Sequence, residues 1–428
     1  MSKKILFTSH TANFQKFNRP FMRMLQESGW KVHYASMGEE KILDADKSFI
    51  VPFTRSPFTI SNIRAYKQLK QIIDRENYDI IHTHTPAGSV VTRLAARHAR
   101  KRGTRVIYTA HGFHFFTGAP LLNWLIYYPT ERLMARYTDT LITINDEDYK
   151  RVKHTFKTDV RYVPGVGVDP ERFKPRLTKK QRNDLRRSLG LKSDDFVMIY
   201  PAELNKNKNQ TMLIMAMEKL VAVNPHIHLL LPGQDSMNGF HSKLIREKDL
   251  QNNIHLLGYR TDIPQLLMAS DLSVSASYRE GLPVHIMEAM TAGLPVVATK
   301  CRGASELVKN HENGYVVKIS NVHDFASEVS EFDTLEAYKE SIKESLALRK
   351  QKKAANENEH AVVQKVVENA TMDIPEPMVE LQIDKMVQDY ASRIQSQGIS
   401  LEQYMQFTGM TIDKLREQMR EQAINNIK

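Results

Sequence analysis

Short apolar runs alternate with amphipathic helical stretches along most of this chain, and this alternation restricts its fold more than any other feature. Runs rich in β-branched or apolar residues lie at 5–7, 32–35, 79–84, 105–109, 140–144 and 160–163. Stretches between them repeat their apolar residues at the helix period, as at 17–28, 63–76 and 88–101. Strands joined by helix-length crossovers predict a parallel sheet covered by helices on both faces.

The alternation stops once and then starts again. Residues 164–176, PGVGVDPERFKPR, are rich in Gly and Pro without a sustained period, which predicts an interdomain linker. The pattern then resumes, with strands expected at 196–200, 228–231, 254–256, 272–275 and 296–298 and helices at 210–223 and 284–291. Two Rossmann-like doubly wound α/β domains, residues 1–163 and 177–324, are therefore expected to face each other across a ligand-binding cleft.

Residues 325–428 have a different character. Strand candidates stop, and the segment is rich in Glu, Lys, Gln and Met. The spacing of Val379, Ile383, Met386 and Tyr390 follows the helix period. We expect this part to form a separate all-α segment.

Composition excludes several classes of protein. The single cysteine, Cys301, excludes an intramolecular disulfide framework and suits the cytoplasm. No apolar run approaches the roughly 20 residues that span a bilayer, and the N-terminus does not resemble a signal peptide. The formal net charge of +11 suits anionic ligands or an anionic membrane surface. No zinc-finger spacing or nucleic-acid motif accompanies it, so no nucleic-acid partner is expected.

The stretch REGLPVHIMEAM at 279–290 carries the clearest functional signal. Pro283 suits the first turn of a helix and Gly293 its C-terminal end. Glu280 is therefore expected in the loop before the helix, where the N–H groups of Gly281 and Leu282 can face a diphosphate. Glu288, one to two turns into the helix, can reach the same ligand, and both carboxylates can accept hydrogen bonds from sugar hydroxyls.

This motif resembles the Glu-x7-Glu signature of the retaining GT-B glycosyltransferases of family four, and residues 2–324 resemble the bacterial branch that builds capsular and exopolysaccharides. The other stretches that carry the resemblance are DIIHTHTP (79–86), YTAHGFHFF (108–116), ELNKNKNQ (203–210), GYRTDIPQLLMASD (258–271) and GASELVKNHENGYVV (303–317).

The resemblance implies a role for each matching residue. Glu280 and His111 are the catalytic candidates and contact the donor sugar, Glu288 holds the ribose hydroxyls, and Lys208 neutralises the diphosphate. It implies a nucleotide-sugar donor, most often a UDP-sugar, a saccharide or lipid-linked acceptor, no cofactor and no metal ion. The resemblance also implies retention of the anomeric configuration. Because no carboxylate is obviously placed as a covalent nucleophile, same-face attack, with the leaving phosphate receiving the acceptor's proton, is the expected route.

The sequence departs from the family at one important place. Where the family usually has an Arg near this lysine, the chain has Glu203, which cannot neutralise a diphosphate. Arg260 and Arg302 are the candidates to help Lys208, and the alternative for each is an ordinary surface charge. His82 and His84 share one face of a strand, where a structural or acceptor-lining role is favoured over metal binding.

The aromatic and apolar residues at 113–116 and 121–128, followed by Arg132 and Arg136, suggest a peripheral contact with the inner face of the cell membrane. The alternative is that these side chains form buried helix core.

Residues 325–423 resemble part of the helical substrate-binding domain of trigger factor, a ribosome-associated chaperone. The segments EVSEFDTLEAYKESIKESL (328–346), VVENATMDIPEPMVELQIDKMV (366–387) and QGISLEQYMQFTGMTIDKLREQMREQA (397–423) carry this resemblance. A second function therefore stays open beside the enzyme: a non-catalytic chimera whose helical arm binds other chains through Met386, Tyr390, Tyr404 and Phe407.

Overall fold

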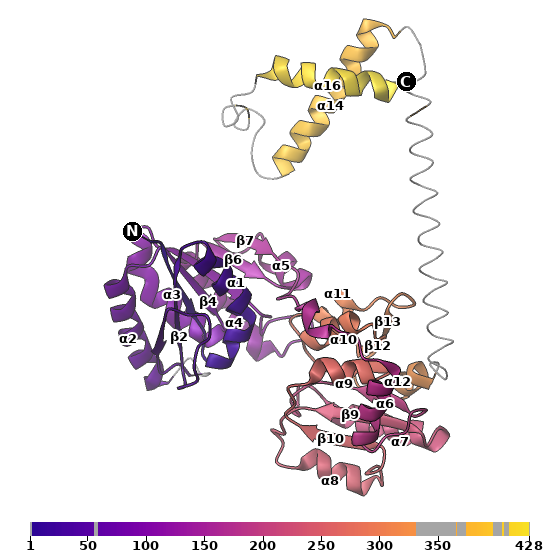
Figure 1. The fold of residues 1–428 in the computed structure, drawn as a ribbon. Coiled ribbons are helices and arrows are strands. Elements are labelled where there is room, and N and C mark those ends of the chain that lie inside the picture. The colour runs from indigo at the N-terminus through magenta and orange to yellow at the C-terminus, as the bar shows by residue number, and fades with distance from the viewer. Residues whose placement is uncertain are drawn as a thin grey trace. The chain divides into compact units, whose positions relative to one another are not determined.

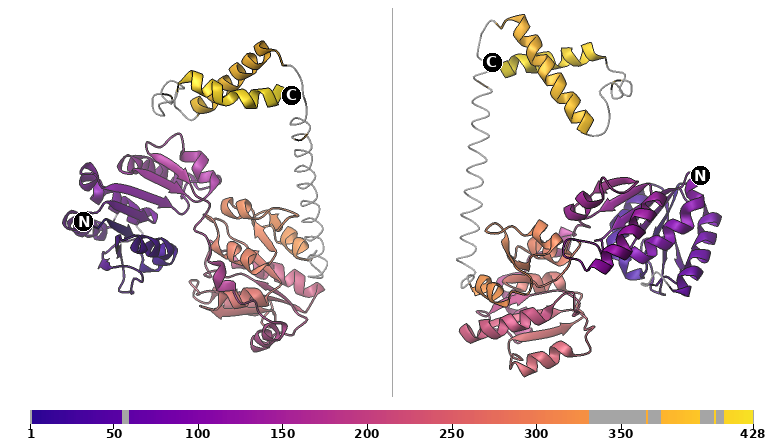
Figure 2. Two further views of the ribbon diagram at one scale, coloured as in Figure 1. Left: turned by 45° about the horizontal axis from the view of Figure 1, so that its top comes forward. Right: turned by 180° about the vertical axis from the view of Figure 1, so that it is seen from behind.

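The computed structural model describes residues 2–54, 59–330, 374–396 and 411–427, together with the single residues 365 and 405. The chain divides into two compact units, Met1–Ile342 and Lys343–Lys428. The first unit contains two α/β domains, each built on a parallel sheet with helices on both faces (Figures 1 and 2). The predicted pair of doubly wound α/β domains is confirmed.

The first domain has a seven-stranded sheet in the order β3-β2-β1-β4-β5-β6-β7. Its strands are β1 (Lys4–Thr8), β2 (Lys31–Ser36), β3 (Lys47–Ile50), β4 (Ile80–His84), β5 (Arg105–Ala110), β6 (Thr140–Thr143) and β7 (Asp159–Tyr162). Its helices are η1 (Ala12–Phe14), α1 (Gln15–Glu27), α2 (Ile60–Glu76), α3 (Pro86–Lys101), α4 (Leu121–Met134), η2 (Ala135–Tyr137) and α5 (Asp146–Val152).

The second domain has a six-stranded sheet in the order β10-β9-β8-β11-β12-β13. Its strands are β8 (Phe196–Ile199), β9 (Ile227–Pro232), β10 (Ile254–Gly258), β11 (Leu272–Ser275), β12 (Val296–Thr299) and β13 (Gly314–Val317). Its helices are η3 (Pro170–Phe173), α6 (Lys179–Ser188), α7 (Gln210–Val223), α8 (Phe240–Glu247), α9 (Ile263–Ala269), α10 (Val284–Ala292), α11 (Arg302–Leu307) and α12 (Val322–Ser330).

Each sheet grows outward from a central strand in one direction and then in the other. The order reverses between β1 and β4 in the first sheet and between β8 and β11 in the second. All the strand pairs are parallel, so the carboxyl ends of the strands lie along one edge of each sheet. Loops diverge at such a reversal, and ligands of open α/β sheets bind there.

Strand β1 shows why a continuous apolar run becomes a central strand. Successive side chains of a strand point to opposite faces, and here both faces are covered. Leu6 packs in a cluster that includes Ala65 and Leu69 of α2, whereas Phe7 packs on the other face with Met22 of α1. A run that alternated polar and apolar residues would place polar side chains against one of these helix layers.

The second domain ends later than the sequence suggests. Helix α12 packs against α7, and Phe325, Ala326 and Val329 lie in the same buried cluster as Leu213 and Leu229. The expected boundary between residues 324 and 325 therefore falls inside this helix. The sequence places the boundary where the composition becomes rich in Glu, Lys, Gln and Met, and a helix that closes the second domain blends into that helical segment.

Several elements were not expected from the sequence. Strand β3 is short, and most of its residues are exposed at the sheet edge, so it lacks an apolar pattern. Helix α4 contains Pro129 and has apolar or aromatic residues on several sides, which masks its helical period. Both differences come from local context that periodicity does not register.

The second unit contains α14 (Glu376–Ser396) and α16 (Ile412–Ile427), which pack together as predicted for a helical segment. Val379, Ile383 and Ala423 form the buried centre of this pair. Met386 packs at the edge of that cluster, which favours a core role for this side chain. The residues Tyr404 and Phe407 lie outside the described residues.

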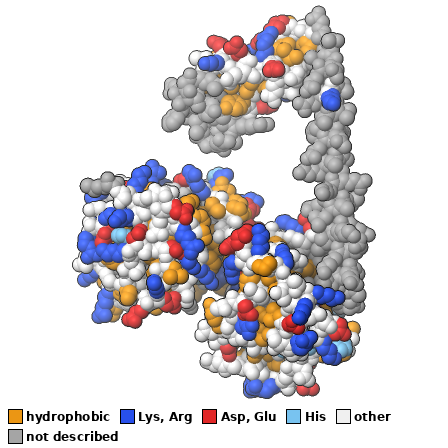
Figure 3. All heavy atoms as spheres, in the orientation of Figure 1, with side chains coloured by type: hydrophobic (Ala, Val, Ile, Leu, Met, Phe, Trp, Pro, Cys, Tyr) orange, Lys and Arg blue, Asp and Glu red, His pale blue; other side chains and the backbone are white. Residues whose placement is uncertain are grey.

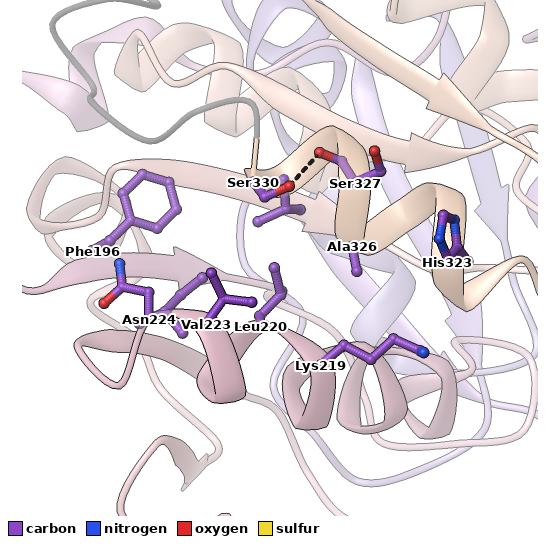
Figure 4. Close-up of a pocket in the computed structure, with 11 residues that line it drawn as sticks. Phe196, Lys219, Leu220, Val223, Asn224, His323, Ala326, Ser327 and Ser330 are labelled. Atoms are coloured by element: carbon purple, nitrogen blue, oxygen red, sulfur yellow. Dashed lines mark hydrogen bonds between the residues drawn. The ribbon is translucent and has the colours of Figure 1, made fainter.

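A cavity of about 350 Å³ lies between α7 and α12 (Figure 4). Its lining includes Phe196 and Ile227, which begin β8 and β9, so it lies at the amino-terminal edge of the sheet. The candidate site residues follow the carboxyl ends of the strands, at the opposite edge. This cavity is therefore separate from the candidate site.

Within the described part of the chain, no helix is both long and apolar enough to cross a membrane. Basic and acidic side chains are interspersed over the face of residues 2–54 and 59–330 shown in Figure 3.

Candidate functional site

The strongest cluster of predicted site residues lies where the second sheet reverses its order. Lys208 lies in the loop after β8, and Glu280 lies in the loop after β11. These two loops meet, and the Lys208 ammonium donates to Oε1 of Glu280 over 2.5 Å. The fold thus brings together two residues that are 72 positions apart in the sequence.

Hydrogen bonds between the two loops hold this pair in place. The N–H of Tyr278 donates to the carbonyl of Asn207 over 2.9 Å, and the Asn207 amide donates to the carbonyl of Arg279 over 3.0 Å. Ser277 donates to the Glu280 carboxylate over 2.5 Å. The Glu280 carboxylate is therefore fixed by a side chain of its own loop as well as by Lys208.

The pair is largely buried, with 21% of the Lys208 side chain and 12% of the Glu280 side chain exposed. Burial acts to lower the pKa of Lys208, but the Glu280 carboxylate outweighs it and the pKa is raised. Burial likewise acts to raise the pKa of Glu280, but Lys208 and His285 outweigh it and the pKa is lowered. Both groups are consequently charged at neutral pH.

Helix α10 follows this loop as predicted. Pro283 is its N-cap residue, and Gly293 ends it in the left-handed conformation, at φ +84°. Within the described residues, the N–H groups of Gly281 and Leu282 form no hydrogen bond. These two N–H groups remain available for an anion at the start of the helix.

Glu288 lies on α10, but it does not contact the Lys208–Glu280 pair. Its carboxylate accepts a hydrogen bond from Arg172 over 2.9 Å, and only 12% of the Glu288 side chain is exposed. Arg172 belongs to η3, in the predicted linker. A ribose bound by Glu288 would therefore lie beside the segment that joins the two domains.

Gly281 lies against the first domain. A methyl group added at this position would lie 2.1 Å from the carbonyl oxygen of His111, and one added at Gly303 would lie 2.2 Å from the carbonyl oxygen of Gly281. Any side chain at either position would force the main chains apart. The linker residue Gly165 has φ +77°, and a methyl group there would lie 2.6 Å from Leu282.

His111 follows β5, and its Nε2 lies 3.0 Å from Nδ1 of His84, the last residue of β4. Burial, with the neighbouring His82, lowers the pKa of His111 to about 3. Burial also lowers the pKa of His84 well below its ordinary value. Both imidazoles are neutral at pH 7, so one nitrogen of the pair donates and the other accepts.

The structure gives Arg302 a different role from the one expected. Its guanidinium donates to Asp148 over 2.6 Å and to the carbonyls of Glu280 and Phe113 over 2.9 and 3.0 Å. Only 3% of its side chain is exposed. Arg302 therefore connects the two domains, and its guanidinium is already occupied by protein acceptors. A diphosphate contact was expected because sequence alone cannot show that Asp148 lies opposite.

Arg260 is also engaged elsewhere. Its guanidinium forms two hydrogen bonds to the carboxylate of Asp262, over 2.8 and 2.6 Å. Asp262 is the N-cap residue of α9. The structure does not bring Arg260 into contact with Lys208 or Glu280 among the described residues.

Sequence reasoning missed three participants. Ser277 orients Glu280, Asp148 anchors Arg302, and His285 is a buried neighbour of the ion pair. Burial, followed by the charge of Lys208, lowers the pKa of His285 to about 3. Ser277 and His285 lie within a few residues of the glutamate motif, a signal that could have identified them. Nothing in the sequence marks Asp148.

Within the residues that the structure describes, no group of three His, Cys, Asp or Glu side chains is arranged to hold a metal ion.

Comparison with known proteins shows which families the chain resembles. Residues 181–352 match the family described as glycosyl transferases group 1, and residues 4–145 match glycosyl transferase 4-like proteins. Residues 334–428 match the C-terminus of bacterial trigger factor.

Individual relatives agree with these matches. The putative glycosyltransferase EpsD of Bacillus subtilis is 42% identical over 334 residues, which are 77% of this chain and 87% of EpsD. An Escherichia coli galactosyltransferase, named for transfer from UDP-Gal to α-D-GlcNAc-diphosphoundecaprenol, is 30% identical over 290 residues. These residues are 66% of this chain and 73% of that enzyme.

The crystal structure of Anabaena HepE in complex with UDP and glucose superimposes with a TM-score of 0.60 and 22% identity. The superposition covers 81% of this chain and 99% of HepE, and it shows a common fold. At the other end of the chain, the trigger factor of Lachnoclostridium phytofermentans is 50% identical over 104 residues, only 24% of that chaperone. The chain thus spans about a quarter of the trigger factor it matches. It belongs to the group 1 family of GT-B glycosyltransferases, enzymes of glycan synthesis, and carries a trigger-factor-like segment at its C-terminal end.

Proposed function

We propose that this protein transfers a sugar from a UDP-sugar to a saccharide or lipid-linked acceptor, with retention of the anomeric configuration and without a metal ion. The observation that carries the proposal is the buried Lys208–Glu280 pair at the reversal of the second sheet. The site offers a cation, a carboxylate and two N–H groups that form no hydrogen bond within the described residues. A ligand with both a diphosphate and a sugar matches this set of groups.

The proposed roles follow from these positions. Lys208 and the N–H groups of Gly281 and Leu282 stabilise the charge that develops on the departing diphosphate. Glu280 accepts hydrogen bonds from the donor sugar, and Glu288 accepts them from the ribose. Lys208 has three N–H donors, so it can bind a phosphate oxygen while it keeps its bond to Glu280.

His111 is proposed to contact the donor sugar from the first domain. Because its imidazole is neutral, it acts as a hydrogen-bond partner rather than as a charged group. The acceptor attacks from the face that the diphosphate leaves, and the leaving phosphate takes the acceptor proton. No carboxylate is assigned as a covalent nucleophile, because Glu280 is held by Lys208 and Ser277.

Release of free nucleotide from a panel of UDP-, GDP- and ADP-sugars tests this proposal. We expect slow hydrolysis of at least one UDP-sugar and loss of that activity in Glu280→Gln. The matched control is Glu218→Gln, an exposed glutamate on α7 that pairs with Lys248. No nucleotide release from any sugar donor, or equal release by Glu280→Gln, would refute the assignment.

The similar Escherichia coli galactosyltransferase is named for a lipid-linked acceptor, and this leads to a second part of the proposal. Among the aromatic residues from which membrane contact was inferred, Phe113 and Phe115 are buried in the core, which supports the alternative for that segment. Leu121, Leu122 and Leu125 at the start of α4 are instead 73%, 63% and 65% exposed. We propose that these leucines meet the membrane surface where a lipid-linked acceptor is presented.

Flotation with vesicles that contain anionic lipid at low salt tests this surface. The full chain is expected to float, and the pair Leu121→Ser and Leu125→Ser is expected to remain at the bottom. Val223→Ser is the control, because this side chain is 81% exposed on the second domain. Equal flotation of all three proteins, or none, would contradict the membrane contact.

A further inference from the structure

Arg279, the residue before Glu280, is a partly buried cation that forms no ion pair with an acidic residue in the part of the chain that the structure describes. Its guanidinium forms no hydrogen bond or ion pair within the described residues. The nearest acid in the sequence, Glu280, is held by Lys208 and Ser277. The neighbouring Arg302 is held by Asp148. Of these charged groups, Arg279 alone forms no ion pair with a described residue, although Glu280, paired with Lys208, attracts it.

The surroundings of Arg279 come from the first domain. Its guanidinium carbon lies 5.9 Å from the ring centre of Phe116, and that of Arg302 lies 5.2 Å from the same ring. Burial, followed by repulsion from Arg302, lowers the pKa of Arg279 below its ordinary value. Asp148 pairs with Arg302 and Glu280 pairs with Lys208, so the charge of Arg279 leaves a net positive charge beside this ring.

Two polar ring side chains, His114 and Tyr127, lie near Arg279. His114 and Tyr127 stack with their ring centres 4.5 Å apart. The charge of Arg279 acts to lower the pKa of His114, and Tyr127 acts to raise the pKa of Arg279. Burial, followed by Arg279 and Arg302, lowers the pKa of His114 to about 4. At neutral pH the imidazole and the phenol can both donate a hydrogen bond without adding charge. Arg279, His114, Tyr127 and Phe116 are called the Arg279 cluster here.

We propose that the Arg279 cluster binds a phosphate or diphosphate group of the acceptor. A guanidinium presents paired N–H donors that fit phosphate oxygens, and an unpaired one in a partly buried position favours an anion. The proposal rests on the glycosyltransfer proposed above and adds a substrate class to it: acceptors that carry a phosphate linkage.

The position of the cluster favours the acceptor over the donor as the source of this phosphate. Lys208 and the N–H groups of Gly281 and Leu282 already provide for the donor diphosphate from the second domain. Three members of the Arg279 cluster lie on the first domain, and Tyr127 is on α4, the helix that exposes Leu121 and Leu125. A lipid-linked phosphate at the cluster would thus be bound by the same helix that presents these leucines.

Calorimetric titration of the full chain with inorganic diphosphate, in the presence of saturating UDP, tests the proposal. UDP fills the donor site, so the remaining binding reports the second anion site. We expect Arg279→Gln to weaken this binding by about tenfold to a hundredfold and Arg279→Lys by less, as for a lost charged hydrogen bond. Arg187→Gln is the charge-matched control, because this arginine is 78% exposed on α6.

The affinity for UDP, measured separately, distinguishes the two sources of phosphate. Unchanged UDP affinity in Arg279→Gln supports an acceptor phosphate, whereas an equal loss of UDP affinity would move Arg279 to the donor and overturn the proposal. Undiminished diphosphate binding by a folded Arg279→Gln would also overturn it. If wild type binds diphosphate through Arg279 but releases nucleotide from no sugar donor, the proposed transfer fails and the anion site stands.

Discussion

Replacement of Lys208 by methionine tests the ion pair at the centre of the site. Methionine keeps most of the aliphatic volume but removes the ammonium, which leaves the carboxylate of Glu280 buried without its cation. Breaking a fully buried pair costs about 3–5 kcal/mol of the unfolding free energy. Ser277 still donates to Glu280, and 21% of the Lys208 side chain is exposed. We therefore expect a loss of about 2–3 kcal/mol at pH 8.

The loss of unfolding free energy in Lys208→Met should be smaller at lower pH. In the wild type, Lys208 keeps the pKa of Glu280 lowered, so this carboxylate contributes stability above its ordinary 4.5 and loses it on acidification. Without Lys208, burial raises that pKa, and the protonated form is the one favoured by folding. The difference in unfolding free energy between wild type and Lys208→Met should therefore shrink as the pH falls from 8 to 5.

Urea denaturation, followed by the circular dichroism of the full chain at pH 8, 6 and 5, measures this difference. The double variant Lys208→Met with Glu280→Gln should recover part of the loss at pH 8, because it removes the uncompensated charge. A deficit that is the same at all three pH values, or a double variant no more stable than Lys208→Met, would show that the pair is not a buried ionic one.

Three further results are expected. Glu288→Gln should weaken UDP binding by about 1–3 kcal/mol in calorimetry, since an amide accepts fewer hydrogen bonds from the ribose, and unchanged affinity would remove Glu288 from the site. The urea midpoint of the wild type should decrease when the pH is lowered from 7.5 to 5. Burial lowers the pKa below the ordinary 6.5 at four histidines, so the unfolded chain binds more protons than the folded one; these are His82, His111, His255 and His285. A midpoint that increases would contradict this. A chain that ends at Ser330 should bind UDP like the full chain, whereas one that ends at Asp324 should aggregate, because it lacks the buried Phe325 and Val329; equal solubility of the two would contradict the packing of α12.

Much of the fold could be predicted from the sequence because the central strands are apolar on both faces. The apolar residues of strands such as β8 and β12 are almost all buried, and their runs stand out without any knowledge of the tertiary structure. Strand β3 and helix α12 could not be predicted in the same way. Strand β3 is an exposed edge strand without an apolar pattern, and α12 is recognised as part of the second domain only from its packing against α7.

The residues of the candidate site also differ in how well the sequence predicts them. Lys208, Glu280 and Gly281 lie in local motifs, and the structure brings them together at the reversal of the sheet. Arg302 was assigned to the diphosphate because a sequence shows a free charge but not its partner. Its carboxylate, Asp148, lies 154 positions away in the other domain, beyond the reach of any local pattern. Arg279 was overlooked for the opposite reason, because its lack of a partner becomes visible only in three dimensions.

We propose above all that the Lys208–Glu280 pair supports retaining transfer from a UDP-sugar. Proton NMR of the sugar that the full chain releases from a UDP-sugar, recorded before mutarotation, tests this claim most directly. We expect the first sugar to appear with the anomeric configuration of the donor, and we expect Glu280→Gln to release none. Initial release of the opposite anomer, or an undiminished rate in Glu280→Gln, would contradict it.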